Sequence, residues 1–216
     1  MKSPDETAAA GPLRGDGSKG TREALQSIYL VIVGLAIVQA LTRVFTRSGD
    51  VFVGTDIFEQ PGWLLLIAFL ATVVRFAHGS ILHFASLDNT RTWRVSMLGL
   101  LAQALVFFVA AFSVETITGF LIALMAIFVV DSAWLLAIRW LHGKEEVPAF
   151  RQWLLSNLIL IVLLGAALGL QQGLEPWWET QLAIGVMVSA VAATVVDYVM
   201  NDDLYFPGTR TKGRHH

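Results

Sequence analysis

Six apolar stretches, each of about 20 residues, divide this chain and leave it few folds to adopt. They cover about residues 26–45, 63–86, 95–114, 116–141, 152–170 and 180–200. A helix of about 20 residues, rising about 1.5 Å per residue, crosses a hydrocarbon core about 30 Å thick. We therefore predict an all-α integral membrane protein, a six-helix bundle in a lipid bilayer, with its membrane domain over residues 24–203.

The two tails and the basic residues predict the orientation of the bundle. Residues 1–23 combine Gly, Ala, Ser and scattered charge and are predicted to be disordered, and residues 204–216 form a basic tail. An even number of spans places both tails on one side, together with twelve of the 15 Lys and Arg residues, whereas the other side holds only Arg43 and Arg47. Because Lys and Arg are enriched in cytoplasmic loops, we predict a cell-membrane protein with both termini cytoplasmic.

An alternative for the first stretch is a cleaved signal peptide. Val38-Gln39-Ala40 resembles a small-residue cleavage site. However, the polar region that precedes this stretch is more than about twenty residues long, which is unusual for a secretory signal. A retained helix is therefore the favoured interpretation, and cleavage would leave the other five spans unchanged.

Composition excludes several classes of chemistry. The chain has no cysteine, which rules out disulfides, zinc–thiolate sites and Cys-ligated iron–sulfur clusters. A net charge of −2 provides no general attraction to nucleic acid, so no nucleic-acid partner is predicted. All four lysines lie outside the apolar stretches, which excludes a buried lysine that binds retinal: Lys2, Lys19, Lys144 and Lys212.

Ionisable side chains inside the apolar stretches are the main candidates for function. Arg75 and His78 lie in the second stretch and Asp131 in the fourth. A charge at the centre of a bilayer costs about 2.5–3.5 kcal/mol, so it is rarely present without a partner or a role. Arg75 follows Trp63 by twelve residues and Asp131 follows Thr116 by fifteen, so both lie at similar depth in helices that run in the same direction. We therefore predict an ion pair between Arg75 and Asp131.

The helical period places Arg75 on a narrow stripe that faces the bundle. Most of the stripe consists of small residues, which allow a neighbouring helix to approach closely. Its other members are Ala68, Thr72, Gly79, Leu82 and Ser86. Two interpretations remain open for the predicted pair: a buried ion pair that fixes helix packing, or part of a pathway for a polar ligand.

Further polar residues gather toward the cytoplasmic ends of the spans. His83 closes the second stretch, Asn157 lies near the start of the fifth, and Asp197 lies near the end of the sixth. Trp134 lies one turn from Asp131 and falls outside the aromatic belts at the two interfaces. These residues predict a vestibule that opens to the cytoplasm and ends at the Arg75–Asp131 pair.

The spacing of the histidines argues against a metal or haem centre. His78 and His83 are five residues apart, about 140° around a helix, whereas a shared ion requires an i, i+4 pair. No other stretch contains histidine for a bis-histidine haem, and no cofactor or metal is predicted. A hydrolase that pairs His78 or His83 with Ser132 or Ser156 across helices remains an alternative.

Three functional hypotheses follow. The first is binding or conduction of an ion, a proton or a small polar solute through Arg75, His78, Asp131 and the polar residues around them. The second is a non-transporting assembly subunit, or an effector that forms homo-oligomers through small-residue stripes such as Gly165-x-x-x-Gly169. The third is an intramembrane enzyme that uses His78.

Overall fold

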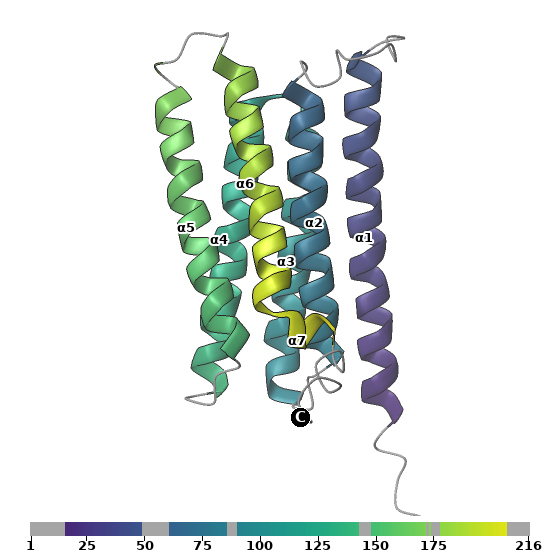
Figure 1. The fold of residues 1–216 in the computed structure, drawn as a ribbon. Coiled ribbons are helices and arrows are strands. Elements are labelled where there is room, and N and C mark those ends of the chain that lie inside the picture. Colours follow the sequence, from purple (N-terminus) through teal and green to yellow (C-terminus); the bar gives the residue numbers. More distant parts are fainter. Residues whose placement is uncertain are drawn as a thin grey trace, which may run out of the picture.

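Six long helices and one short helix make up the described part of the chain. The computed structural model describes residues 16–48, 61–85, 90–142, 148–171, 173 and 178–206, and every regular element within these ranges is a helix. The helices, labelled in Figure 1, are α1 (Asp16–Ser48), α2 (Pro61–Ala85), α3 (Thr90–Ser113), α4 (Ile117–His142), α5 (Pro148–Gln171), α6 (Glu179–Met200) and α7 (Asp202–Tyr205). Each of α1–α6 contains a segment long and apolar enough to cross a membrane, so the prediction of a multi-pass helical membrane protein is confirmed.

The structure corrects the predicted boundaries of both tails. Helix α1 already begins at Asp16, so residues 16–23, which composition assigns to a disordered tail, are helical. At the other end, α7 follows directly on α6 and its Tyr205 is buried, although the sequence analysis places Tyr205 in the basic tail. The remaining tail residues, 1–15 and 207–216, lie outside the described residues.

Local sequence explains where several helices begin. Pro61 and Pro148 are the first residues of α2 and α5, a position where the fixed φ of proline suits a helix and its missing N–H is not needed. A tight turn joins α3 to α4, in which the Thr116 backbone N–H donates to the Ser113 carbonyl at 3.1 Å. These two helices therefore form the antiparallel hairpin that their short connection predicts.

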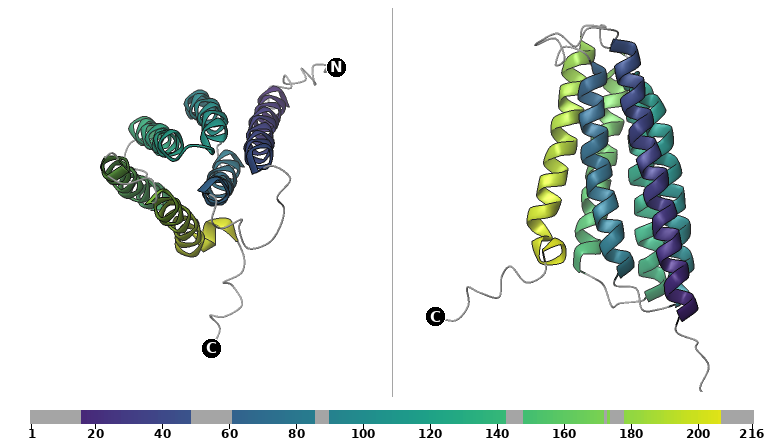
Figure 2. Two further views of the ribbon diagram at one scale, coloured as in Figure 1. Left: turned by 90° about the horizontal axis from the view of Figure 1, so that it is seen from above. Right: turned by 90° about the vertical axis from the view of Figure 1, so that its right-hand side faces the viewer.

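Seen from above in Figure 2, the six long helices lie side by side, with α2 between α1 and α6. The most extensive contacts join α3 to α4, α2 to α6, α4 to α5 and α1 to α3, whereas α2 touches α4 only slightly. The start of α1 and the short helix α7 lie at the same end of the bundle, as an even number of spans requires (Figure 1). The principal partner of α2 is thus α6, and not α4 as the predicted ion pair assumed.

The small-residue stripe of α2 faces the bundle as predicted. Ala68 and Thr72 are buried, Arg75 is 5% exposed and Gly79 is also buried. By contrast, large apolar side chains cover the outer face of the bundle, and Val162 for example is 70% exposed. A surface of this kind suits a lipid bilayer, in which close packing and polar contacts, not hydrophobic burial, hold helices together.

A close approach of α3 to α4 depends on Gly99. A Cβ atom added at Gly99 would overlap the indole ring of Trp134, which lies against α3 at this point and is 9% exposed. Trp134 is therefore a packed residue inside the bundle and does not face lipid.

Gly99→Ala is expected to lower the free energy of unfolding by about 1–3 kcal/mol, because the methyl group displaces the Trp134 indole from its packed position. Unfolding in mixed detergent micelles measures the change. Gly34→Ala is a suitable control, because an added Cβ at Gly34 meets no atom within 4 Å. Equal losses in the two variants would contradict the proposed role of Gly99.

Candidate functional site

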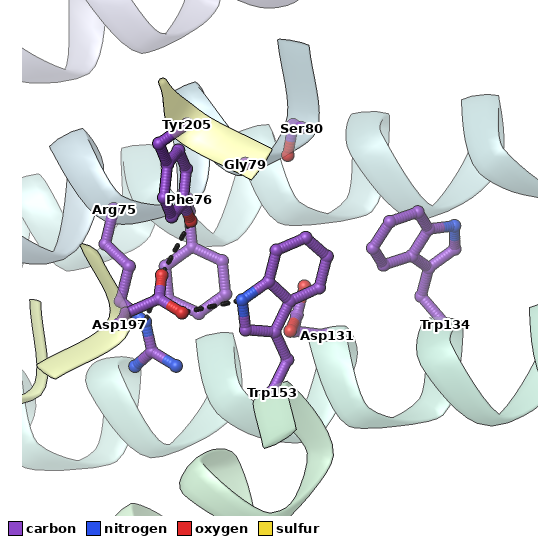
Figure 3. Close-up of a pocket in the computed structure, with 9 residues that line it drawn as sticks. All are labelled: Arg75, Phe76, Gly79, Ser80, Asp131, Trp134, Trp153, Asp197 and Tyr205. Carbon is purple, nitrogen blue, oxygen red and sulfur yellow. Dashed lines mark hydrogen bonds and ion pairs between the residues drawn. The ribbon is translucent and has the colours of Figure 1, made fainter. Parts of the chain in front are cut away.

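Arg75 is paired with Asp197 in the structure, not with Asp131 as predicted. The Nε atom of Arg75 lies 3.5 Å from the Oδ2 atom of Asp197, and the side chains of both residues are 5% exposed. The Nη2 atom of Arg75 donates a hydrogen bond of 3.0 Å to Ser156 Oγ on α5. The buried base therefore joins α2, α5 and α6, and Figure 3 shows its guanidinium group next to the Asp197 carboxylate.

The register between α2 and α6 explains this choice of partner. The Thr194 hydroxyl of α6 donates to the Ala71 carbonyl of α2 at 3.1 Å, which holds the two helices in contact at that level. Arg75 follows Ala71 by one helical turn and Asp197 follows Thr194 by about one turn. Helices α2 and α6 run in the same direction, so Arg75 and Asp197 meet about one helical turn beyond the Thr194–Ala71 contact.

Asp197 is the best-satisfied carboxylate of the site. Its Oδ1 atom accepts hydrogen bonds from Trp153 Nε1 at 2.6 Å and from Asn201 Nδ2 at 2.8 Å, and its Oδ2 atom accepts one from the Tyr205 hydroxyl at 2.7 Å. Figure 3 shows the indole of Trp153 and the phenol of Tyr205 directed at the carboxylate. Together with Arg75, these donors stabilise the ionised form of Asp197.

Tyr205 keeps its proton in this arrangement. Burial and its hydrogen bond to Asp197 raise the pKa of the Tyr205 hydroxyl above its usual value near 10, because an ionised phenol would lie next to a carboxylate. Its ring also stacks on Tyr198, with ring centroids 4.4 Å apart. The chain beyond α6 thus turns back and adds a neutral donor to the site.

Asp131 has a separate set of partners. Its Oδ1 atom accepts a hydrogen bond from Gln103 Nε2 at 3.1 Å, and its Oδ2 atom accepts one from Asn157 Nδ2 at 2.6 Å. The carbonyl oxygen of Gln103 in turn accepts from the Tyr29 hydroxyl at 3.2 Å and from the Ser80 hydroxyl at 3.3 Å. Two neutral amides therefore hold Asp131, and the network extends from α4 to α1, α2, α3 and α5.

A small cavity lies between the two carboxylates. Its volume is about 20 Å³, which is room for about one water molecule. It is lined by Arg75, Phe76, Gly79, Ser80, Asp131, Trp134, Trp153, Asp197 and Tyr205 (Figure 3). The site thus brings Arg75, Asp131 and Asp197 together around a space that fits only a water-sized ligand.

Aromatic side chains fill much of the space in which the sequence analysis expects an open vestibule. Phe150 lies between Trp134 and Trp153, with ring centroids 6.3 Å and 5.7 Å away, and both tryptophans line the cavity. Tyr205 lies against Gly79, so that a Cβ at Gly79 would lie 3.4 Å from the tyrosine hydroxyl. In this conformation the polar residues therefore surround a small, water-sized cavity and not a wide vestibule.

The remaining predicted residues lie close to the cavity or outside the described side chains. His78 is half-buried, and its Nδ1 atom lies 2.7 Å from the Tyr198 hydroxyl, while its ring contacts Tyr205 at 4.8 Å between centroids. Asn157 is fully buried against Asp131. His83 belongs to α2, but its side chain lies outside the described part of the structure.

Among the described side chains, His78 is not paired with Ser132 or Ser156, as the hydrolase alternative would require. Ser156 accepts its hydrogen bond from Arg75, and Ser132 Oγ has no hydrogen-bond partner within the described part of the chain. His78 is instead engaged with Tyr198. Among the described residues there is also no group of three or more His, Cys, Asp or Glu side chains that could hold a metal ion.

The comparisons with known proteins add no identification. No protein-family model, curated protein or solved structure matches the chain. The function therefore has to be argued from the site itself.

Gln103, Trp153 and Tyr205 are among the residues of the site that were not predicted as members of it. Gln103 is the most polar side chain in the third apolar stretch. A strongly polar residue surrounded by apolar ones was a signal that sequence reasoning could have used. Trp153 lies near the start of the fifth apolar stretch, but it is 9% exposed and donates to Asp197. Tyr205 carries no comparable signal, because only the reversal of the chain after α6 brings it back to the bundle.

Two buried polar atoms of the site have no hydrogen-bond partner among the described residues. They are Nη1 of Arg75 and Oδ1 of Asn157. An unsatisfied buried polar atom is costly, so its presence calls for an explanation such as a small polar ligand. Both residues also contact an acid of the site, since Arg75 pairs with Asp197 and Asn157 donates to Asp131.

Proposed function

We propose that this multi-pass membrane protein binds and transfers protons, or an ion no larger than a water molecule, at the site formed by Arg75, Asp131 and Asp197. The observation that carries the proposal is the balance of buried charge. Among the described residues, the buried charged side chains are this one base and these two acids. If all three were ionised, one negative charge would lie uncompensated inside the bundle, which is costly at low dielectric. A bound proton or small cation removes that charge.

The hydrogen-bond partners favour Asp131 as the group that takes up the proton. Asp197 pairs with the Arg75 guanidinium, which compensates its charge, and accepts hydrogen bonds from three further donors. Asp131 has only the two amides of Gln103 and Asn157. A side-chain amide carries a donor and an acceptor, so a rotated amide can accept a hydrogen bond from protonated Asp131. The free Oδ1 atom of Asn157 suits this second arrangement.

A half-buried histidine lies between the cavity and one end of the bundle. The Nδ1 atom of His78 is 2.7 Å from the Tyr198 hydroxyl, and its ring contacts Tyr205, which lines the cavity. Histidine titrates near neutral pH and is a common proton carrier. We infer that His78 exchanges protons with the aqueous side next to α7. The distribution of Lys and Arg supports a cytoplasmic location for that end, with the protein in the cell membrane.

The proposal is tested by proton flux in vesicles. Purified protein is reconstituted into liposomes that contain a pH-sensitive dye, and a pH step is applied together with a potassium diffusion potential. Wild-type protein should acidify the lumen faster than protein-free vesicles do. Asp131→Asn should reduce the rate to that of protein-free vesicles, because the asparagine side chain takes up no proton in the pH range of the assay.

A second acid provides the matched control for this experiment. Glu115 lies in the turn between α3 and α4, and its carboxylate is 3.5 Å from the guanidinium of Arg43 in a partly exposed pair. Glu115→Gln should retain wild-type flux. The proposal fails if folded Asp131→Asn protein conducts like wild type, or if wild-type protein conducts no faster than empty liposomes.

A second candidate function is an assembly subunit or an effector that forms homo-oligomers. The specific observation in its favour is the outward position of Gly165 and Gly169 on α5, where an added Cβ would meet no atom within 4 Å. Small residues spaced by four positions commonly form contacts between membrane helices. Loss of a cross-linked dimer in Gly165→Leu, with the dimer retained in Gly34→Leu, would support this function.

A further inference from the structure

A groove between α5 and α6 lies outside the polar site and has no assigned role. Its volume is about 220 Å³. Phe128 and Leu124 of α4 form its floor, Leu163 and Ala167 lie on the α5 wall, and Gly185 lies on the α6 wall. Apart from Gln181 and Ser189, the residues that line it are apolar.

The packing of the bundle explains why the groove exists. α5 packs mainly on α4, and α6 packs mainly on α2, so these two consecutive helices make few contacts with each other. The hydrogen bond from Trp153 to Asp197 joins α5 to α6 near the end where α7 lies. The groove lies in the other half of the two helices, toward their connection, where this link is absent.

We infer that the groove binds one acyl chain of a membrane glycerophospholipid. Gln181 and Ala190 mark its ends on α6, and nine residues of helix span about 14 Å. This length is about half of a hydrocarbon core that is about 30 Å thick, so the groove has the depth of one leaflet. Large apolar side chains such as Leu163 and Val188 are exposed on the same two helices, which suits lipid at the mouth of the groove.

The groove has few polar groups, and their number and position suit a glycerolipid better than ordered water. An apolar cavity of this size has too few hydrogen-bonding partners to hold ordered water. Gln181 lies two residues from the start of α6, near the membrane surface, where its amide can donate a hydrogen bond to the ester carbonyl of the lipid. The occupant is therefore a lipid of the leaflet next to the α5–α6 connection, and the inference does not depend on proton transfer.

Photolabelling tests this assignment. The full-length protein is reconstituted in phosphatidylcholine vesicles that contain phosphatidylcholine with a diazirine on one acyl chain, and the labelled peptides are identified by mass spectrometry. Label should concentrate on the facing segments of α5 and α6 that line the groove. Gly185→Leu should reduce this labelling by about tenfold, because the new side chain occupies the groove and removes the contacts of the chain.

Gly34→Leu on α1 is the matched control, because an added Cβ at Gly34 also meets no atom within 4 Å and the residue is outside the groove. It should leave the groove labelling unchanged. The inference is overturned if label is spread evenly over the exposed faces of all helices, or if Gly185→Leu retains wild-type labelling. A dimer that is lost only in Gly185→Leu would also overturn it, because a second copy would then be the occupant.

Discussion

Replacing Arg75 with methionine should lower the free energy of unfolding by about 3–5 kcal/mol, because the change leaves a buried carboxylate without its countercharge. Methionine retains much of the length of the arginine stem, so loss of packing contributes little. Unfolding in mixed micelles with a denaturing detergent, followed by circular dichroism, measures the loss.

The double variants distinguish Asp197 from Asp131. Combining Arg75→Met with Asp197→Asn should recover much of the lost stability, with a coupling energy of about 1–3 kcal/mol, because these two side chains are in direct contact at 3.5 Å. Combining Arg75→Met with Asp131→Asn should give a smaller coupling energy, because Asp131 is hydrogen-bonded to Gln103 and Asn157. A larger coupling energy with Asp131 than with Asp197 would contradict the geometry of the site.

Replacing Tyr205 with alanine should lower the free energy of unfolding by about 3–5 kcal/mol, as expected for the loss of a buried aromatic side chain. Tyr205 is 5% exposed, stacks on Tyr198, and donates to Asp197 at 2.7 Å. Tyr205→Phe retains the ring and removes only the hydroxyl, so it should cost about 1–3 kcal/mol. Equal stability of wild type and both variants would show that α7 does not pack on the bundle.

The pH dependence of Tyr205→Phe provides a second readout. The pKa of Tyr205 is higher in the folded than in the unfolded chain, so its contribution to stability is complete below about pH 10 and is lost as the pH rises toward the folded value. Above pH 10, wild type should therefore lose stability faster than Tyr205→Phe by up to about 1.4 kcal/mol per pH unit. The variant retains Asp197, Arg75 and Tyr198, so the difference between the two curves isolates Tyr205. Parallel curves would contradict a raised pKa at this position.

The structure brings most of the predicted site residues together, but not through the predicted contacts. Arg75, Asp131, Trp134 and Asp197 line one cavity, and Asn157 contacts Asp131. Polar residues in apolar stretches are conspicuous, and the helical period determines which of them face inward. Gln103, Trp153 and Tyr205 were missed because each gains its role only through a contact with a distant part of the chain.

The predicted pairing failed for an identifiable reason. Depth along a helix can be estimated from residue counts, and by that measure Asp131 matched Arg75. Asp197 was predicted near the cytoplasmic end of the sixth span, and the residue count alone does not show that the chain beyond α6 turns back as α7. Equal depth is necessary for an ion pair, but the helices must also be neighbours, and α2 contacts α6 much more than α4.

The sequence alone determined the six apolar helices and the presence of charge within them. Both properties are local, because the length of an apolar stretch and the position of an ionisable residue can be read along the chain. Only the tertiary structure decided which acid pairs with Arg75, how Tyr205 returns to the bundle, and where α5 and α6 separate. These features depend on which helices pack together and in which register, and that choice is made by shape and contact between segments far apart in the sequence.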